Sequence, residues 1–102
     1  MIVLIAEDQS LVRQGLVALI EDQATEVIEC ADGTEALQLL KQGNVDLALL
    51  DVGLPGRTGI DVLSEVRSRE IPTKIIILTG DTASYSPPVS YTHLTLPTNR
   101  EV

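Results

Sequence analysis

The sequence predicts an α/β fold, in which a doubly wound parallel sheet carries helices on both faces. Aliphatic runs of strand length recur along the first 80 residues, and segments with helical spacing separate them. Two of these runs end abruptly on acids. Strands that alternate with helices form parallel sheets joined by right-handed crossovers. We therefore expect the element order βαβαβαβ.

The first strand is predicted at residues 2–6, which are all aliphatic and are followed by Glu7 and Asp8. A continuous apolar run of this length is typical of a strand that is buried on both faces. Ser10 is a good cap for a helix from Leu11 to about Glu21. Its predicted inward face consists of Leu11, Val12, Leu16, Leu19 and Ile20.

The second strand is predicted at residues 27–31 and is less apolar, as is common near a sheet edge. Asp32 then predicts a turn and a helix cap, and a second helix follows that stops at residues 43–44. The inward residues of this helix are predicted to be Ala36, Leu37, Leu39 and Leu40.

The third strand, at residues 45–50, leads directly into Asp51 and then into a loop that contains Gly53, Pro55 and Gly56. Open α/β sheets bind ligands at the carboxyl edge of their strands, which makes Asp51 the main candidate functional residue. Thr58 is predicted to cap a third helix that ends before Pro72. Its predicted inward residues are Ile60, Val62, Leu63 and Val66.

The fourth strand is predicted at residues 73–79 and ends on Thr79. In the simplest doubly wound order, 2-1-3-4, the first and third strands are neighbours, so Glu7, Asp8 and Asp51 meet at one edge. Three carboxylates repel one another unless a cation holds them, and oxygen ligands suit Mg²⁺. Asp51 could then accept a phosphoryl group as an acyl phosphate. The Thr79 hydroxyl could bind a phosphoryl oxygen and shift the loop after it.

Three segments together resemble the receiver domain of bacterial two-component response regulators, most closely the NarL/LuxR type. They are Glu7-Asp8, Asp51-Val-Gly-Leu-Pro-Gly-Arg-Thr-Gly, and Thr79-Gly80. The resemblance covers residues 1 to about 80 and implies a flavodoxin-like fold. It also implies a role for each matching residue: Asp51 as phosphoacceptor, Asp8 as a direct Mg²⁺ ligand, Glu7 as a water-mediated ligand, the Gly53 carbonyl as a further ligand, and Thr79 as the switch hydroxyl.

The resemblance further implies a sensor histidine kinase as partner, and control of transcription through an output domain as function. The chain itself would not be an enzyme. Two features depart from the family pattern. The family has a Lys at the end of a fifth strand, whereas the lysines here are Lys41 and Lys74, and Gly80 stands where the family usually has Ala.

The composition limits the possible partners and compartment. The net charge of −8, with two Lys and five Arg scattered along the chain, argues against direct binding of nucleic acid or an anionic membrane. No apolar segment is long enough to span a bilayer. Cys30 is the single cysteine and cannot form an internal disulfide, which favours the cytoplasm. DNA binding by the parent protein would need a helix-turn-helix domain that this segment lacks.

The pattern changes from Asp81 onward, where adjacent prolines follow and no helix or strand periodicity is visible. Residues 89–98 resemble one reading frame of a transposase-type sequencing adapter; a natural linker rich in Thr, Ser and Pro is the alternative. We predict a partial receiver domain at residues 1–83 and a non-native or disordered tail at residues 84–102. The sheet would end after its fourth strand, leaving that strand as an unpaired edge, and the dimerisation face would be missing.

Two other functions remain open at this point. A phosphatase of the haloacid dehalogenase type also forms an aspartyl phosphate at a strand end, but that class needs a second Asp two residues later, where this chain has Gly53. A non-phosphorylated interaction module of the same fold is the other alternative. Mg²⁺-dependent labelling by acetyl phosphate, abolished by Asp51→Asn, distinguishes it from a phosphoacceptor.

Overall fold

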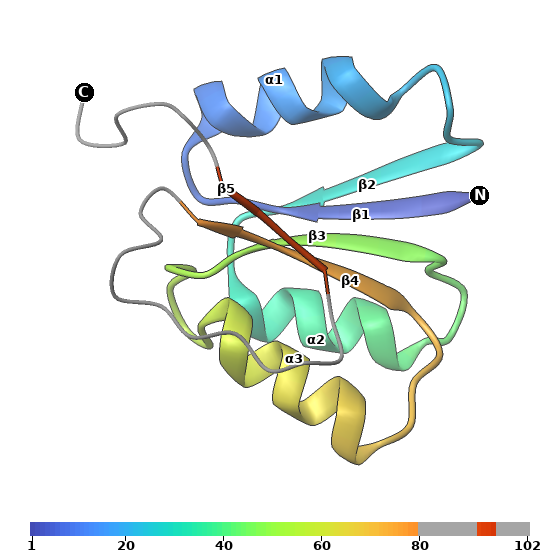
Figure 1. The fold of residues 1–102 in the computed structure, drawn as a ribbon, viewed down its shortest axis with the longest axis vertical. Helices are drawn as coiled ribbons and strands as arrows, with labels where there is room; N and C mark the ends of the chain where they lie inside the picture. Colours follow the sequence, from blue (N-terminus) through green and yellow to red (C-terminus); the bar gives the residue numbers. More distant parts are fainter. Residues whose placement is uncertain (80–91, 96–102) are drawn as a thin grey trace.

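The structure, a computed structural model, describes residues 1–79 and 92–95. Figure 1 shows a sheet with α1 on one face and α2 and α3 on the other. The helices are α1 (Ser10–Ile20), α2 (Gly33–Lys41) and α3 (Gly59–Ser68). The strands are β1 (Ile2–Ala6), β2 (Glu26–Cys30), β3 (Leu47–Asp51), β4 (Lys74–Thr79) and β5 (Thr92–Thr95). The predicted α/β class with helices on both faces is confirmed.

The sheet is parallel and has the order β2-β1-β3-β4-β5, so the predicted order 2-1-3-4 of the first four strands is confirmed. β1 lies between β2 and β3, and its register pairs Ala6 with both Cys30 and Leu50. The residues that follow β1 and those that end β3 therefore come out at the same edge of the sheet.

The core lies on both faces of the sheet. Successive β1 residues point to opposite faces, and all four from Val3 to Ala6 are fully buried. Leu4 and Ala6 pack in one cluster with buried residues of α2 and α3, whereas Val3 and Ile5 pack in a second cluster with Leu16 of α1. Burial on both faces explains why the strand sequences are continuous aliphatic runs rather than alternating ones.

The predicted caps hold for two of the three helices. The Asp32 side chain accepts hydrogen bonds from the backbone N–H groups of Thr34 and Glu35, and the Thr58 hydroxyl accepts one from Asp61. The predicted Ser10 cap is wrong, because Ser10 is the first residue of α1 and the extended residue before it, Gln9, makes no side-chain capping bond.

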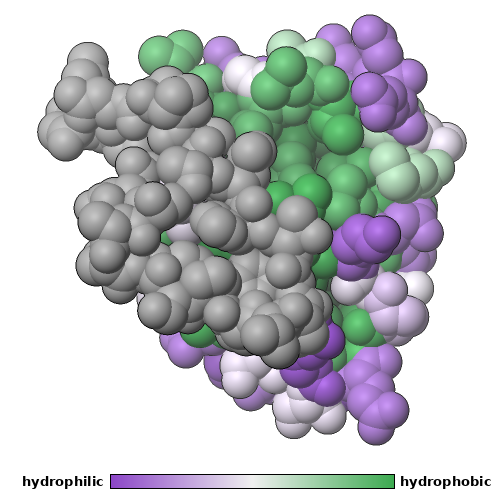
Figure 2. All heavy atoms as spheres, viewed as in Figure 1, coloured by the Kyte–Doolittle hydropathy of each residue, from purple (hydrophilic) through white to green (hydrophobic). Residues whose placement is uncertain are grey.

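The inward face predicted for α1 is also only partly correct. Leu11 and Leu19 are 81% and 76% exposed, whereas Leu16 is buried. Val12, Leu16 and Ile20 lie on one side of the helix. Each residue of a helix is rotated by roughly 100° from the one before it, so Leu11 and Leu19 lie on another side. Figure 2 shows hydrophobic side chains gathered at the top of the molecule, over α1 and the adjoining part of the sheet.

The prediction that the sheet ends after its fourth strand is corrected by β5, which pairs in parallel with β4 from Ile76↔Thr92 to Thr79↔Thr95. Four residues are too few to show a periodicity, but the exposed backbone groups of an edge strand accept any short extended segment, and Thr favours extended backbone. The predicted unpaired edge of β4 is therefore covered along these residues. The predicted boundary at residue 83, and the remainder of the predicted tail, lie outside the described residues.

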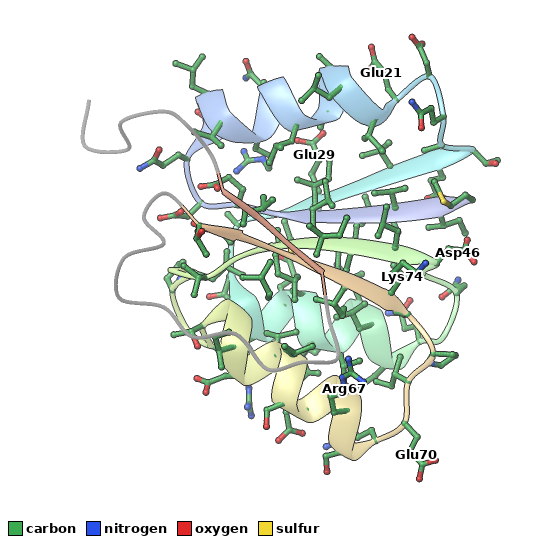
Figure 3. All side chains as sticks on the ribbon, viewed as in Figure 1. Glu21, Glu29, Asp46, Arg67, Glu70 and Lys74 are labelled. Atoms are coloured by element: carbon green, nitrogen blue, oxygen red, sulfur yellow. The ribbon has the colours of Figure 1, made fainter. Side chains whose placement is uncertain are left out.

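At the amino ends of the strands, Asp46 links β1 and β4 to the start of β3. Its side chain accepts a hydrogen bond of 2.7 Å from the N–H of Ile2, and its backbone carbonyl accepts one of 3.0 Å from Lys74. Figure 3 shows Asp46 and Lys74 at this amino edge. The bonds fix the starts of β1 and β4 relative to β3, so the carboxyl ends of these strands are in register.

Candidate functional site

Three carboxylates meet at the carboxyl edge of the sheet, as predicted. Glu7 and Asp8 follow β1 and Asp51 ends β3, and each offers an oxygen within 4.8 Å of the other two. Glu7 is fully buried and Asp51 is 2% exposed, whereas Asp8 is exposed to solvent. The cluster is therefore open to solvent on the side of Asp8 and enclosed by protein on the other.

Backbone N–H groups orient the two buried carboxylates. The N–H of Gln9 donates to Glu7 Oε2 at 3.0 Å, and the N–H of Gly53 donates to Asp51 Oδ1 at 3.2 Å. Glu7 is also held at its own backbone, because its N–H donates to the carbonyl of Cys30 at 3.0 Å. Hydrogen bonds from N–H groups to a carboxylate fix its direction.

The loop after Asp51 is packed tightly against the start of α2 and α3. The N–H of Gly33 donates to the carbonyl of Pro55 at 3.0 Å. A Cβ atom at Gly33 would lie 1.7 Å from the carbonyl oxygen of Arg57, and one at Gly59 would lie 2.6 Å from that of Asp51. Gly56 has a φ of 76°, a left-handed conformation that favours glycine. These glycines let the loop come close enough to hold Asp51 in place.

Thr79 ends β4 at the same edge, one residue beyond Leu78, which pairs with Asp51. It is 2% exposed, and among the described residues its hydroxyl oxygen is a buried side-chain atom without a hydrogen-bond partner. Buried polar groups are nearly always satisfied, and an unsatisfied one costs free energy. A hydrogen-bonding partner for the Thr79 hydroxyl would remove this cost.

The cluster has the chemistry of a site for a hard divalent cation. All three side chains offer oxygen, and their mutual repulsion is relieved when a cation is bound. The nearby Cys30 is a different kind of group, since burial raises the pKa of its thiol to about 11 and leaves it protonated at neutral pH. Gly53 lies in the exposed turn after β3, and a ligand role for its carbonyl stays a prediction.

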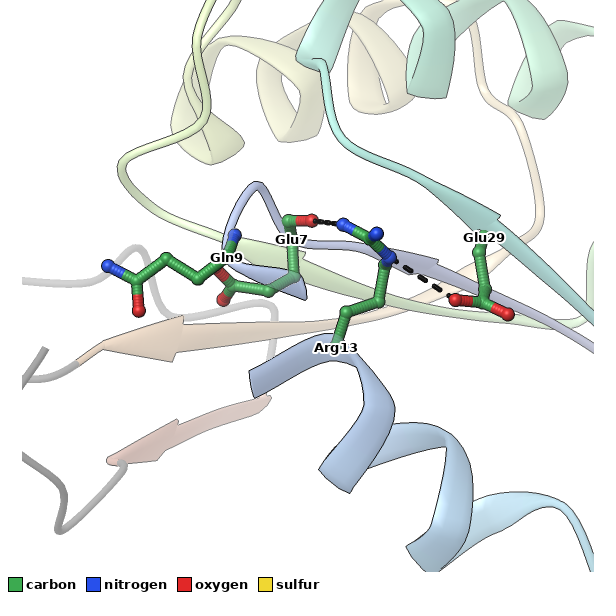
Figure 4. Close-up of polar contacts among 4 residues, drawn as sticks. All are labelled: Glu7, Gln9, Arg13 and Glu29. Carbon is green, nitrogen blue, oxygen red and sulfur yellow. Dashed lines mark hydrogen bonds and ion pairs between the residues drawn. The ribbon is translucent and has the colours of Figure 1, made fainter. Parts of the chain in front are cut away.

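Sequence reasoning missed Arg13, which reaches the cluster from α1. Its Nη1 donates to the backbone carbonyl of Glu7 at 2.6 Å, and its Nε pairs with Glu29 of β2 at 3.2 Å (Figure 4). One signal was present in the sequence: a cation at the start of the helix that directly follows an acidic pair. Whether such a cation turns toward the acids depends on how the helix packs, which the spacing alone does not determine.

The sequence pattern of the response regulator receiver domain matches residues 3–87. The chain belongs to this family. The receiver family was predicted from the acids and the Thr at the strand ends, and that prediction is confirmed. Similar proteins include the transcriptional regulatory protein PdtaR of Mycobacterium tuberculosis, 41% identical over 79 residues, and the nitrate/nitrite response regulator protein NarP of Escherichia coli, 38% identical over 84 residues.

These alignments cover 76% and 80% of this receiver chain but only 38% and 39% of PdtaR and NarP. The chain thus spans less than two thirds of the length of the curated relatives it matches. Both relatives are regulators by name, in line with the predicted NarL/LuxR type. Among the described residues, the helices are all too short or too polar to cross a membrane.

Solved receiver structures have the same fold. A LuxR-family DNA-binding response regulator from Staphylococcus aureus is 34% identical, with a TM-score of 0.73 over 81% of this chain and 71% of that one. The response regulator TrrA of Thermotoga maritima, solved in complex with Mg²⁺-BeF, is 28% identical, with a TM-score of 0.81 over 93% of this chain and 85% of that one.

Proposed function

We propose that this receiver domain accepts a phosphoryl group on Asp51 from the phosphohistidine of a sensor histidine kinase. The observation that carries the proposal is the meeting of Glu7, Asp8 and Asp51 within 4.8 Å at the carboxyl edge of the sheet, the edge where β4 ends on Thr79, whose hydroxyl has no partner among the described residues. Membership of the receiver family and the Mg²⁺-BeF complex of TrrA support the same reading.

Asp51 is the proposed nucleophile because it is the last residue of β3, the central strand of the sheet, and because both its side chain and its backbone are held in place. Gly53 donates to one of its oxygens, and Gly59 packs against its backbone carbonyl. In the transfer, a carboxylate oxygen of Asp51 attacks phosphorus, the bond from phosphorus to the histidine nitrogen breaks, and an acyl phosphate forms. In-line placement and charge neutralisation provide most of the catalysis in such reactions.

Mg²⁺ fits the donor set, which is made of oxygen alone and carries three negative charges. We assign Asp8 and Asp51 as direct ligands, Glu7 as a ligand through water, and the carbonyl of Gly53 as a further ligand. When bound, Mg²⁺ neutralises charge on the phosphoryl oxygens. The exposure of Asp8 leaves the site accessible to the cation and to the phosphoryl donor.

Thr79 is the proposed switch residue. Its buried hydroxyl has no partner among the described residues, and a phosphoryl oxygen on Asp51 would supply one. This new hydrogen bond would stabilise a different position of the carboxyl end of β4 when Asp51 is phosphorylated than when it is unmodified. Phosphorylation would in this way change the position of the carboxyl end of β4.

The wider assignments follow from the same proposal. The chain acts as a phosphoacceptor rather than as an enzyme, and it resides in the cytoplasm with its kinase. Transcription is controlled by the longer parent protein, through an output domain of helix-turn-helix type that contacts DNA. The segment itself, with its net charge of −8, makes no direct contact with nucleic acid or membrane.

Incubation of the full chain with acetyl phosphate and Mg²⁺ tests the proposal. The intact mass should rise by one phosphoryl group, the rise should disappear when Mg²⁺ is chelated, and Asp51→Asn should abolish it. Asp46→Asn is the matched control and should leave labelling unchanged, because Asp46 lies just before β3 at the amino ends of the strands and Asn keeps a side-chain oxygen that can accept from the N–H of Ile2. Labelling of Asp51→Asn at the wild-type level, or a folded wild-type chain that takes up no phosphoryl group, would refute the proposal.

A further inference from the structure

We infer that Arg13 is a positioning residue for the acidic site, which holds the peptide between Glu7 and Asp8 in the orientation that binds a divalent cation. The inference rests on the proposed function, because it takes the site to bind Mg²⁺. It starts from one contact: Arg13 donates from Nη1 to the carbonyl of Glu7 at 2.6 Å (Figure 4).

The carbonyl of Glu7 controls the direction in which the backbone continues to Asp8. It belongs to the planar peptide that joins Glu7 to Asp8, so fixing its oxygen fixes the plane from which the Asp8 backbone continues. The other side of Glu7 is held by β2, since its N–H donates to the carbonyl of Cys30. Arg13 thus completes the restraint of the backbone at the point where it leaves the sheet.

Glu29 holds the guanidinium in place for this contact. Arg13 Nε pairs with Glu29 Oε1 at 3.2 Å, and the side chains are 21% and 47% exposed. A pair this exposed adds little stability by itself. Its role is geometric, because the planar guanidinium can donate to Glu29 and to the Glu7 carbonyl at the same time, which a Lys ammonium does less well.

Charge and positioning make opposite predictions for this residue, which allows a decisive test. The Arg13 side chain is cationic and lies close to the site, so electrostatics alone predicts that its removal strengthens Mg²⁺ binding. Positioning predicts the reverse, because the peptide that carries Asp8 becomes free to rotate. Loss of residues that orient metal ligands typically weakens metal binding by about 10-fold or more.

The experiment measures Mg²⁺ affinity of the full chain by isothermal titration calorimetry, with thermal unfolding without Mg²⁺ as a check on folding. Arg13→Met should weaken Mg²⁺ binding by about 10-fold. Arg13→Lys should show a smaller loss, of about 3-fold, because one of the two contacts can be kept. Glu29→Gln should change the affinity by no more than about 2-fold, because the amide oxygen of Gln can still accept from Arg13 Nε and only the charge of an exposed pair is lost.

Arg69→Met is the matched control. Arg69 forms an equivalent pair with Glu65 on the last turns of α3, at 3.1 Å, and has no contact with the site among the described residues. Its variant should bind Mg²⁺ like the wild type, even if its melting temperature falls. A purely structural role for Arg13 would lower the melting temperature in the same way and leave the affinity of the folded chain unchanged.

The outcomes separate this inference from the proposed function. A folded wild-type chain that binds no Mg²⁺ overturns the proposed function. A wild-type chain that binds Mg²⁺, with Arg13→Met at equal or higher affinity, overturns only the role of Arg13. If Arg13→Met does not fold, Arg13→Lys decides: an affinity equal to that of the wild type overturns the inference, and a weaker one supports it.

Discussion

Replacement of Gly33 by Ala should strongly destabilise the domain, although alanine is the better helix former. Gly33 is the first residue of α2, and a Cβ atom there would lie 1.7 Å from the carbonyl oxygen of Arg57. That neighbour is backbone, so no side-chain rotation relieves the overlap. The loop of residues 52–58 must move away from α2, and the hydrogen bond from Gly33 to Pro55 is weakened.

The expected magnitude follows from these contacts. Overpacking of this kind costs about 1–3 kcal/mol, and a stretched hydrogen bond adds about 1 kcal/mol. The helix propensity of alanine offsets less than about 1 kcal/mol. We therefore expect Gly33→Ala to lower the free energy of unfolding by about 2–3 kcal/mol, and to slow labelling of Asp51, because the displaced loop is the one that follows the nucleophile.

Urea unfolding followed by circular dichroism measures the effect, with Gly15→Ala as the matched control. Gly15 lies in the middle of α1, where a Cβ atom would meet nothing within 4 Å, so its replacement should stabilise the domain by about 0.5–1 kcal/mol. A Gly33→Ala chain as stable as the wild type would show that the loop is not packed against α2 as described.

Two further predictions concern buried groups. Thr79→Val should raise the free energy of unfolding by about 1 kcal/mol without Mg²⁺, because it removes a buried hydroxyl that has no partner among the described residues. Thr73→Val should lower it by about 1 kcal/mol, since the Thr73 hydroxyl donates to the carbonyl of Val45 at 2.7 Å. Thermal melts in which both variants shift the melting temperature in the same direction would contradict this prediction. Burial raises the pKa of Cys30 from 9.0 to about 11. Between pH 9 and 11 the unfolded chain therefore binds fewer protons than the folded chain. The free energy of unfolding should fall over this range, by at most about 1.4 kcal/mol per pH unit. Cys30→Ala should lack this loss of stability. An identical dependence of stability on pH in the wild type and in Cys30→Ala would contradict the prediction.

The sheet and the acidic site were predictable because the same constraint shapes both. A strand buried on both faces must be aliphatic throughout, so an acid such as Asp51 that interrupts the run marks the point where the strand leaves the core. Parallel strands then bring Glu7 and Asp51 to one edge. The caps Asp32 and Thr58 were predictable as well, because the capping hydrogen bond is local.

Apart from the Ser10 cap, the features that sequence reasoning missed depend on tertiary contacts. The exposure of Leu11 and Leu19 depends on which side α1 presents to the sheet. The strand Thr92–Thr95 depends on the free edge of β4, which provides the pairing that so short a segment cannot generate itself. The bond from Arg13 to Glu7 depends on how closely α1 approaches β1. The pattern of apolar and charged residues along the chain does not determine which of these contacts form.

The position of β1 in the sheet has a consequence for synthesis of the protein. β1 is translated before the other described strands of this domain, yet Val3 pairs with Leu47 of β3, which is translated much later. Until then, a fully apolar strand with open edges has no partner on one side, and such nascent segments are prone to aggregate. Slower translation after β1 has left the ribosomal tunnel and before β3 has done so would prolong this interval, so synonymous codon choice in the corresponding stretch should affect the soluble yield.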